Sequence, residues 1–367
     1  MLRAEAWIDA RLAARRTRLG RSRPVTIDAH AGYAHPNGVR LLGRVLEESA
    51  PWNPAEEDGR LANLRGIGRL FATHEIPHAR VELSYADGRK TTMADAEGYL
   101  DAVLPSAPRP STRWTEARGQ VLDDDGAAMG ESVAMPVLSV GDAARFAVLS
   151  DIDDTIMQTG AENLARNLWT TFTGNPLTRR VYDHVAELMT RLAHTGGGAA
   201  DGGAAGGNDG RGARVNPIFY LSSSPWNLYG MIRDVLERND VPWGPIFLRD
   251  YGIDEAKFIA GTHGVHKVGN AERLMDEFEG LPFLLVGDLG QADAEVYAQV
   301  ARGRPGRVMG VILHQPSARA HARKRRHVEE IEALGIPVIV TRDYAEAIAF
   351  AERQGWIDAR QGWIDAP

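Results

Sequence analysis

The chain has 367 residues, 44% of them hydrophobic, and a formal net charge of −7. This length predicts two domains, because a single hydrophobic core stops growing at about 250–300 residues, and the acidic balance argues against a protein that binds nucleic acid over its whole surface. The chain has no cysteine, which excludes disulfides, thiolate metal sites and a cysteine nucleophile and fits a reducing cytoplasm.

Residues 1–24 predict a basic N-terminal helix or tail. Arginine recurs through the segment beside Trp7 and Ile8, and at helical spacing such a segment could lie on an anionic bilayer. A solvated helix or a frayed terminus is the alternative. No stretch approaches the roughly 20 apolar residues that a membrane-spanning helix needs, and no apolar signal core follows the charged N-terminus. We therefore expect a cytoplasmic protein that is soluble or peripheral at a membrane.

Residues 25–140 consist of short segments with alternating apolar and polar side chains, broken by glycine turns. The predicted strands are Val39–Val45, Ala79–Tyr85, Gly98–Val103 and Trp114–Val121. This spacing predicts a small all-β sandwich, and Val81–Gly88 followed by Asp95–Leu100 is similar to the transthyretin-like or carboxypeptidase-regulatory type of sandwich. Histidines are scattered here rather than clustered. We interpret the domain as a scaffold, or as a docking module for an unidentified protein partner.

An apolar run from Phe146 to Leu149 predicts a strand buried on both faces, because the run is short, unbroken and ends abruptly in polar residues. Asp151, Asp153 and Asp154 follow it directly. Three carboxylates at one strand end oppose one another's ionisation unless a cation neutralises them. Oxygen ligands favour a hard ion, and magnesium keeps water and phosphate oxygens in its shell. The sequence therefore predicts a Mg²⁺ site that receives a phosphate group.

Strand and helix patterns alternate across residues 141–350. The later predicted strands are Pro217–Leu221, Ile246–Leu248, Pro282–Val286 and Val308–Leu313, and the predicted helices are Leu164–Phe172, Tyr182–Leu192, Trp226–Asn239 and Lys267–Phe278. Such alternation predicts an α/β domain with a doubly wound parallel sheet, whose site lies outside the carboxyl ends of its strands.

Two further segments predict no chemistry. Residues 195–214 are rich in glycine and alanine and carry too little apolar surface to repay the entropy of ordering, which predicts a disordered insertion. Residues 351–367 hold a tandem heptapeptide, Arg353–Ala359 and Arg360–Ala366. One tandem copy is too short for a solenoid, and we interpret this stretch as a C-terminal tail.

Polar residues follow three of the predicted strands. The motifs are Ser150-Asp-Ile-Asp-Asp-Thr155, Tyr220-Leu-Ser-Ser-Ser-Pro-Trp-Asn-Leu-Tyr229 and Gly287-Asp-Leu-Gly-Gln-Ala-Asp293. Together they resemble the actin-patch-type phosphatidate phosphatases, a lipin-like branch of the haloacid dehalogenase superfamily, over roughly residues 140–350. The resemblance implies a haloacid-dehalogenase-like fold. Too few residues separate the first two motifs for a large cap domain, so we expect an open site, which suits a bulky or interfacial substrate.

The resemblance also implies roles for individual residues. Asp151 would be the nucleophile that takes the phosphoryl group, and Asp153 would give a proton to the leaving alkoxide and later take one from water. The metal would be held by the Asp151 carboxylate, the backbone carbonyl of Asp153, Asp288 and Asp293. Lys267 would stabilise phosphoryl oxygens and restrain the carboxylates.

Three of the expected roles stay open between alternatives. Ser222 stands where the family places a hydroxyl on a phosphoryl oxygen, with Ser223 and Ser224 as neighbouring alternatives, and the amides that follow could serve equally. Thr155 either caps the turn after the first strand or bonds the phosphate. Asp154 is expected to stabilise that turn.

The resulting hypothesis is a Mg²⁺-dependent phosphatase that hydrolyses phosphatidate at a membrane surface to diacylglycerol and phosphate, through a phosphoaspartyl intermediate. The same chemistry on another phosphomonoester, of a protein or a soluble metabolite, is the first alternative. A non-catalytic phosphatidate-binding module is the second. Lipin-like binding domains are thought to lose the acid/base aspartate, so the presence of Asp153 favours an enzyme. A nucleic acid partner is not expected.

Overall fold

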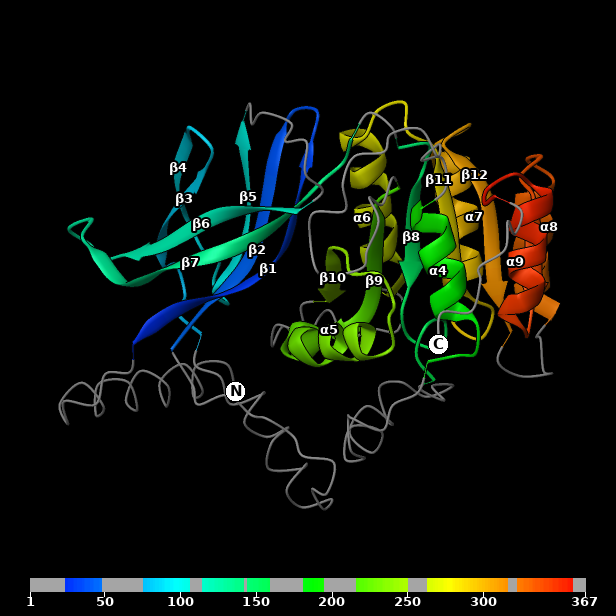
Figure 1. Cartoon of the computed structure of the whole chain (residues 1–367), viewed down its shortest axis with the longest axis horizontal. Coiled ribbons are helices and arrows are strands. Elements are labelled where there is room, and N and C mark those ends of the chain that lie inside the picture. The colour runs from blue at the N-terminus through cyan, green and yellow to red at the C-terminus, as the bar shows by residue number, and fades with distance from the viewer. Residues whose placement is uncertain are drawn as a thin grey trace, which may run out of the picture.

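The computed structural model describes residues 24–47, 75–105, 114–141, 144–158, 181–194, 216–249, 263–315 and 322–358. Two sheets, one of seven strands and one of six, lie side by side (Figure 1). Residues 1–23 of the predicted basic segment, the predicted helix at 164–172 and the glycine-rich tract at 195–214 fall outside the described residues. Among the described helices, none is long and apolar enough to span a bilayer.

The first sheet is built from the N-terminal part of the chain. Its strands are β1 (Val25–His35), β2 (Gly38–Glu47), β3 (Arg80–Tyr85), β4 (Gly88–Met93), β5 (Tyr99–Pro105), β6 (Trp114–Leu122) and β7 (Ala128–Ser139). Their order is β4-β3-β6-β7-β1-β2-β5. Neighbours pair antiparallel except β1 and β7, which pair parallel through Gly32–Ala34.

This sheet curls into a barrel-like shape rather than dividing into the two layers of the predicted sandwich. It is one continuous sheet, and its two edge strands approach each other, since the Lys90 ammonium on β4 donates to the Val103 carbonyl on β5 at 2.9 Å. Alternate residues such as Val81 and Leu83 fill the interior. Alternation in the sequence predicts which face of a strand is buried, but the pairing of distant strands decides whether the sheet divides.

The second sheet is parallel throughout. Its strands are β8 (Ala147–Asp151), β9 (Ile218–Pro225), β10 (Ile246–Arg249), β11 (Phe283–Asp288), β12 (Val308–His314) and β13 (Val338–Thr341). The strand order is β10-β9-β8-β11-β12-β13. The first strand of this sheet, β8, is central: β9 and β10 are added on one side of it, and β11, β12 and β13 on the other, as the predicted doubly wound arrangement requires.

Helices cover both faces of the parallel sheet (Figure 1). They are α4 (Val185–His194), η2 (Trp226–Leu228), α5 (Tyr229–Arg238), α6 (His263–Glu277), α7 (Asp293–Gly303), α8 (Ala322–Glu332) and α9 (Tyr344–Arg353). Val148 on β8 packs in one core with α4, α5 and α9, whereas its neighbours Ala147 and Leu149 pack in another with α6, α7 and α8. Apolar side chains on both faces explain why these strands are continuous hydrophobic runs.

The barrel and the parallel sheet share a core. Tyr33 of β1, Leu42 of β2 and Leu138 of β7 belong to the same buried cluster as α6 and α7. The Tyr33 hydroxyl donates to Glu277 Oε2 at 2.5 Å, and the rings of Trp114 and Trp243 stack with their centroids 4.4 Å apart. The two sheets are therefore packed against each other by apolar and polar contacts together.

The segment after residue 350 is part of the fold, which corrects the predicted tail. The predicted boundary falls inside α9, and Trp356 and Ile357 beyond it are 4% and 2% exposed. A Cβ at Gly310 would lie 2.1 Å from the Trp356 ring, so the indole packs directly on the β12 backbone. The first heptapeptide copy supplies this tryptophan; the second copy lies outside the described residues.

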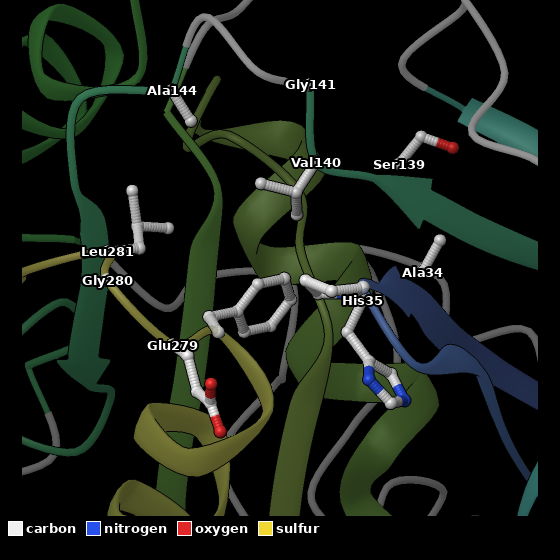
Figure 2. Close-up of a pocket in the computed structure, with 11 residues that line it drawn as sticks. Ala34, His35, Ser139, Val140, Gly141, Ala144, Glu279, Gly280 and Leu281 are labelled. Atoms are coloured by element: carbon white, nitrogen blue, oxygen red, sulfur yellow. The ribbon is translucent and has the colours of Figure 1, made fainter.

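A cavity of about 200 Å³ lies where the barrel meets the parallel sheet (Figure 2). Ala144 and Leu281, which line it, precede β8 and β11, so it opens at the amino ends of the parallel strands, opposite their polar carboxyl ends. The His35 ring nitrogens and the Ser139 hydroxyl are buried and unpartnered. Because these atoms have no accessible surface, the cavity does not present them to a ligand.

Candidate active site

The predicted polar residues gather at the carboxyl edge of the parallel sheet. Asp151 is the last residue of β8, Asp288 ends β11 and Ser222 lies near the end of β9. Parallel strands bring such ends to one edge. Two helices add the remaining groups: Asp293 begins α7, and Lys267 lies in the second turn of α6, not at its start as predicted.

Lys267 holds two of the carboxylates together. Its ammonium donates to Asp151 Oδ1 at 2.7 Å and to Asp293 Oδ1 at 2.5 Å. Asp293 Oδ2 in turn accepts the backbone N–H of Asp288 at 3.1 Å. The four residues are between 0% and 4% exposed. The cluster is therefore a buried ionic network in which every interaction is weakly screened.

Burial and mutual repulsion dominate the electrostatics of this network. Burial, followed by the charge of Asp293, raises the pKa of Asp151 well above its usual value, although Lys267 acts in the opposite direction. Burial and Asp293 likewise raise the pKa of Asp288. Burial alone would lower the pKa of Lys267, but Asp151 and Asp293 raise it above that of an ordinary lysine. The lysine therefore stays charged, while the carboxylates need further positive charge.

The carboxylates fit a hard divalent cation. Asp151, Asp288 and Asp293 each offer an oxygen, and these atoms lie within 4.8 Å of one another. Asp151 Oδ2 and Asp288 Oδ2 are buried without a hydrogen-bond partner, which is costly for a charged oxygen unless it binds a cation. When ionised, three carboxylates and one ammonium leave two negative charges. An oxygen-only donor set of that charge suits magnesium or a similar ion.

The Asp153 carboxylate contacts two serine side chains of β9. Its Oδ2 accepts hydrogen bonds from the hydroxyls of Ser222 at 2.6 Å and Ser224 at 3.1 Å. Ser222 Oγ also accepts the backbone N–H of Ser224 at 2.9 Å. Ser222 was expected to contact a phosphoryl oxygen, whereas here it orients the expected acid/base group. The Asp153 carbonyl, the expected metal ligand, accepts the Gln291 side-chain amide at 3.0 Å.

A tight turn follows Asp153. Asp154 has a left-handed backbone, with φ of 60°, a conformation that aspartate tolerates better than most residues. Its N–H donates to the Met157 carbonyl at 2.9 Å, and its carbonyl lies 3.1 Å from His314 Nδ1. The Thr155 hydroxyl is buried and has no hydrogen-bond partner, so the alternative in which it caps the turn finds no support in the structure.

Sequence reasoning missed two residues that hold these parts in place. Gln291 links the turn after β11 to the turn after β8, because its backbone N–H donates to Asp288 Oδ1 at 2.5 Å while its side chain reaches Asp153. His314 is the last residue of β12 and stands beside Asp288 in the sheet register. The signal used for Asp288, a polar residue at the end of a buried strand, would also have found His314.

A family model described as "Phosphatidate phosphatase APP1, catalytic domain" matches residues 146–315. Phosphatidate phosphatase APP1 of Saccharomyces cerevisiae is 26% identical over 166 residues, which are 45% of this chain and 25% of the yeast protein. The uncharacterized protein C29B5.04c of Schizosaccharomyces pombe is 22% identical over 228 residues, 60% of this chain and 33% of that protein. The chain thus matches only a quarter to a third of these relatives' length.

Comparison with solved structures gives weaker similarity. A carbohydrate acetylesterase from Xanthomonas citri aligns at 12% identity with a TM-score of 0.29, over 90% of this chain and 74% of that one. A β-glucuronidase from Ruminococcus gnavus aligns at 9% identity with a TM-score of 0.23, over 87% and 53% of the two chains. These scores are too low to carry an argument about fold. The family model, by contrast, spans every motif residue described above, and over residues 146–315 the chain is similar to the catalytic domain of the actin-patch-type phosphatidate phosphatases.

Proposed function

We propose that this protein is a Mg²⁺-dependent phosphatidate phosphatase, which hydrolyses phosphatidate to diacylglycerol and phosphate at a membrane surface. The observation that carries the proposal is the placement of Asp151, Asp288, Asp293 and Lys267 in one buried cluster, with Asp153 oriented beside it by two serine hydroxyls. This cluster is the basis for proposing the reaction class, the hydrolysis of a phosphate ester. The lipid substrate comes from the activity named for the yeast relative.

In the first half of the proposed reaction, a carboxylate oxygen of Asp151 attacks phosphorus, and the bond from phosphorus to the ester oxygen breaks. Asp153 gives its proton to that oxygen, so diacylglycerol leaves as an alcohol. Both serine hydroxyls donate to Asp153 Oδ2, an arrangement that suits a proton on Oδ1. Lys267 holds Asp151 in place through its Oδ1.

In the second half, water attacks the phosphorus of the phosphoaspartate. Asp153, now ionised, takes a proton from the water, and the bond from phosphorus to Asp151 breaks, which releases phosphate and restores both aspartates. A cation bound by Asp151, Asp288 and Asp293 would supply charge neutralisation for the carboxylates and the phosphoryl oxygens. The Lys267 ammonium would add a fixed positive charge at the same place.

We further propose that the parallel domain is haloacid-dehalogenase-like. The proposed nucleophile ends β8, which is central in the strand order β10-β9-β8-β11-β12-β13. Its partners lie in the C-terminal half of β9 and at the end of β11, on either side. The division into a barrel at residues 25–140 and a phosphatase domain that begins at residue 141 is part of this proposal. The described structure extends the latter to residue 358.

Phosphate release by the purified protein tests the proposal. Phosphatidate in mixed micelles is compared with p-nitrophenyl phosphate, each with Mg²⁺ and with EDTA, for the wild type and for Asp151→Asn and Asp153→Asn. Asp124→Asn, at an exposed turn of the barrel, is the matched control. We expect phosphate to be released from phosphatidate only when Mg²⁺, Asp151 and Asp153 are all present. Asp124→Asn should release phosphate at the wild-type rate.

The other outcomes separate the alternatives. Cleavage of the soluble ester alone would keep the chemistry and remove the lipid assignment. Binding to phosphatidate vesicles without turnover would indicate a binding module and contradict the proposed enzyme. Activity retained by Asp151→Asn would contradict the assignment of the nucleophile.

A further inference from the structure

We propose that the barrel positions the acid/base group of the site through an aromatic contact next to Ser222–Ser224. These serines lie in the C-terminal half of β9, directly before the helical turn at Trp226, and are called the serine turn below. His30 of β1 is the barrel residue that makes the contact. The kinetic part of this inference rests on the proposed phosphatase activity, whereas the structural part does not. It assigns the barrel a role in the reaction beyond that of a scaffold or docking module.

His30 packs against two aromatic side chains of the parallel domain. It is 2% exposed. Its ring is stacked on Trp226, with the centroids 4.7 Å apart and the planes 5° from parallel, and its centroid lies 4.0 Å from that of Tyr229. The Tyr229 hydroxyl accepts the backbone N–H of Ala31 at 2.8 Å. Two ring contacts and a buried hydrogen bond thus fix β1 to the segment that begins at Trp226.

That segment is the direct continuation of the serine turn. Only Pro225 separates Ser224 from Trp226, and η2 then leads into α5 without a gap. The backbone N–H of Tyr229 donates to the Trp226 carbonyl, so the two aromatic residues form one turn. Trp226 is only two residues after Ser224, so a change in the position of Trp226 would also displace the Ser224 hydroxyl.

The barrel also supports Trp226 from a second strand. The Tyr99 ring at the start of β5 lies with its centroid 5.6 Å from that of Trp226. The Arg44 guanidinium lies 4.3 Å from the centroid of Tyr99 and pairs with Glu75 at 2.9 Å. Half-buried Trp226 is held by barrel residues on β1 and β5, in addition to its own domain.

The consequence for the site follows from the hydrogen bonds of the serine turn. The hydroxyls of Ser222 and Ser224 orient the Asp153 carboxylate, and proton transfer depends steeply on the placement of the acid. A hydrogen bond from a hydroxyl weakens sharply when the donor–acceptor distance lengthens or the bond angle bends. Loosening of Trp226 would therefore reduce the rate of proton transfer more than substrate binding, which makes His30 a positioning residue.

A second group of barrel contacts provides a matched control. Arg40 of β2 pairs with Glu277 at 2.6 Å, near the C-terminal end of α6, and also with Asp101. Glu277 directly precedes the segment that leads to β11, at the amino edge of the sheet. Arg40→Gln therefore weakens the same barrel interface at a place remote from the serine turn.

Amide hydrogen exchange, followed by mass spectrometry, tests the structural part without any assumption about activity. In His30→Ala we expect faster exchange confined to residues 222–229. His30→Phe, which keeps an aromatic ring in the stack, should restore wild-type exchange there, and Arg40→Gln should leave that segment unchanged. If His30→Ala does not fold, Tyr99→Leu, which alters a half-buried ring, gives the same comparison.

Steady-state kinetics with p-nitrophenyl phosphate test the kinetic part. We expect His30→Ala to lower kcat by roughly tenfold while KM stays within about twofold, with rescue by His30→Phe. The inference would be overturned if His30→Ala showed wild-type exchange and wild-type kcat. It would also be overturned if His30→Phe failed to restore them, or if Arg40→Gln changed exchange at residues 222–229 and kcat as much as His30→Ala does. If the wild type cleaves no phosphate ester, the proposed function fails, and the exchange result alone decides whether the barrel positions the turn.

Discussion

At the scale of single residues, the site is a balance between burial and charge. The Lys267 ammonium lies 2.7 Å from Asp151 Oδ1 and 2.5 Å from Asp293 Oδ1. The attraction of these two carboxylates outweighs the cost of burying the ammonium. The ammonium of Lys267 leaves Asp151 Oδ2 without a hydrogen-bond partner, and Asp288 Oδ2 is likewise buried and unpartnered. A second source of positive charge is therefore needed for the carboxylates to ionise together.

This imbalance predicts how the stability of the metal-free protein changes with pH. The pKa of Asp288 is raised in the folded state by burial and by Asp293, from a usual value of 3.8. Below that value both states are protonated and the group contributes nothing. As pH rises, the unfolded state releases its proton first, so stability falls until pH passes the raised folded pKa.

Urea unfolding in EDTA between pH 4 and pH 8 measures this effect. Asp288→Asn keeps the oxygen that accepts the Gln291 N–H but cannot ionise. We expect this variant to gain stability relative to the wild type as pH rises, whereas Asp124→Asn runs parallel to the wild type. Mg²⁺ should reduce the difference. A wild-type curve parallel to that of Asp288→Asn would contradict the raised pKa.

The two serines that contact Asp153 should not be equivalent. The Ser222 hydroxyl donates to Asp153 at 2.6 Å and also accepts the backbone N–H of Ser224. The Ser224 hydroxyl makes the longer contact with Asp153, at 3.1 Å. We expect Ser222→Ala to lower kcat by roughly ten- to hundredfold, a part of what general acid–base catalysis supplies, and Ser224→Ala to lower it less. Steady-state assays with p-nitrophenyl phosphate check the order. Equal kcat values for the two variants would show that the hydroxyls do not orient the acid.

At the scale of elements, the sequence predicted the strands that form fully buried apolar runs, missed two strands that are largely exposed, and also missed the largely buried β1. β8, β9 and β11 are buried along their whole length and were found as apolar runs. β4 is exposed or half-buried throughout, and the first half of β7 is exposed, so neither has a hydrophobic period. A strand whose burial comes from distant partners leaves little trace in its own residues.

The candidate site shows the same division. The positions of Asp151, Ser222 and Asp288 followed from strand ends, which are local features of the sequence. The contact between Ser222 and Asp153, two residues 69 positions apart, depends on how two strands are placed in register. Gln291 lay inside a recognised motif, yet its link to Asp153 across 138 positions has no local signal.

The C-terminal segment beyond α9 gives a prediction at this scale. Trp356 is 4% exposed and packs on Gly310 and on Phe350, with the two rings edge to face at 5.4 Å. We expect Trp356→Ala to lower the free energy of unfolding by about 3–5 kcal/mol, because it leaves a cavity against the β12 backbone. Urea unfolding measures the change. Leu334→Ala, at a leucine that is 48% exposed, is the control, and an equally small loss in both variants would contradict the role of the segment in the core.

At the scale of the whole molecule, two sheets predicted as separate domains share buried side chains. Tyr33 is 0% exposed although it belongs to the barrel, because its ring lies against Phe219, Phe247 and Phe278, with centroids between 5.4 and 6.1 Å away. Sequence patterns report burial but not the partner that provides it. The alternation around Tyr33 therefore gave no indication that β1 faces the parallel domain.

A shared core predicts that the chain unfolds as one cooperative unit. Differential scanning calorimetry of the intact protein should show a single transition, because separation of the sheets would expose Tyr33 and its aromatic neighbours to water. Tyr33→Phe removes only the hydroxyl that donates to Glu277 and should lower Tm by a few degrees, as the loss of about 1 kcal/mol implies. Tyr33→Ala removes the ring and should divide the transition in two. Two resolved transitions in the wild type would show that the barrel and the parallel domain are energetically independent, and the contacts of β1 would then serve position rather than stability.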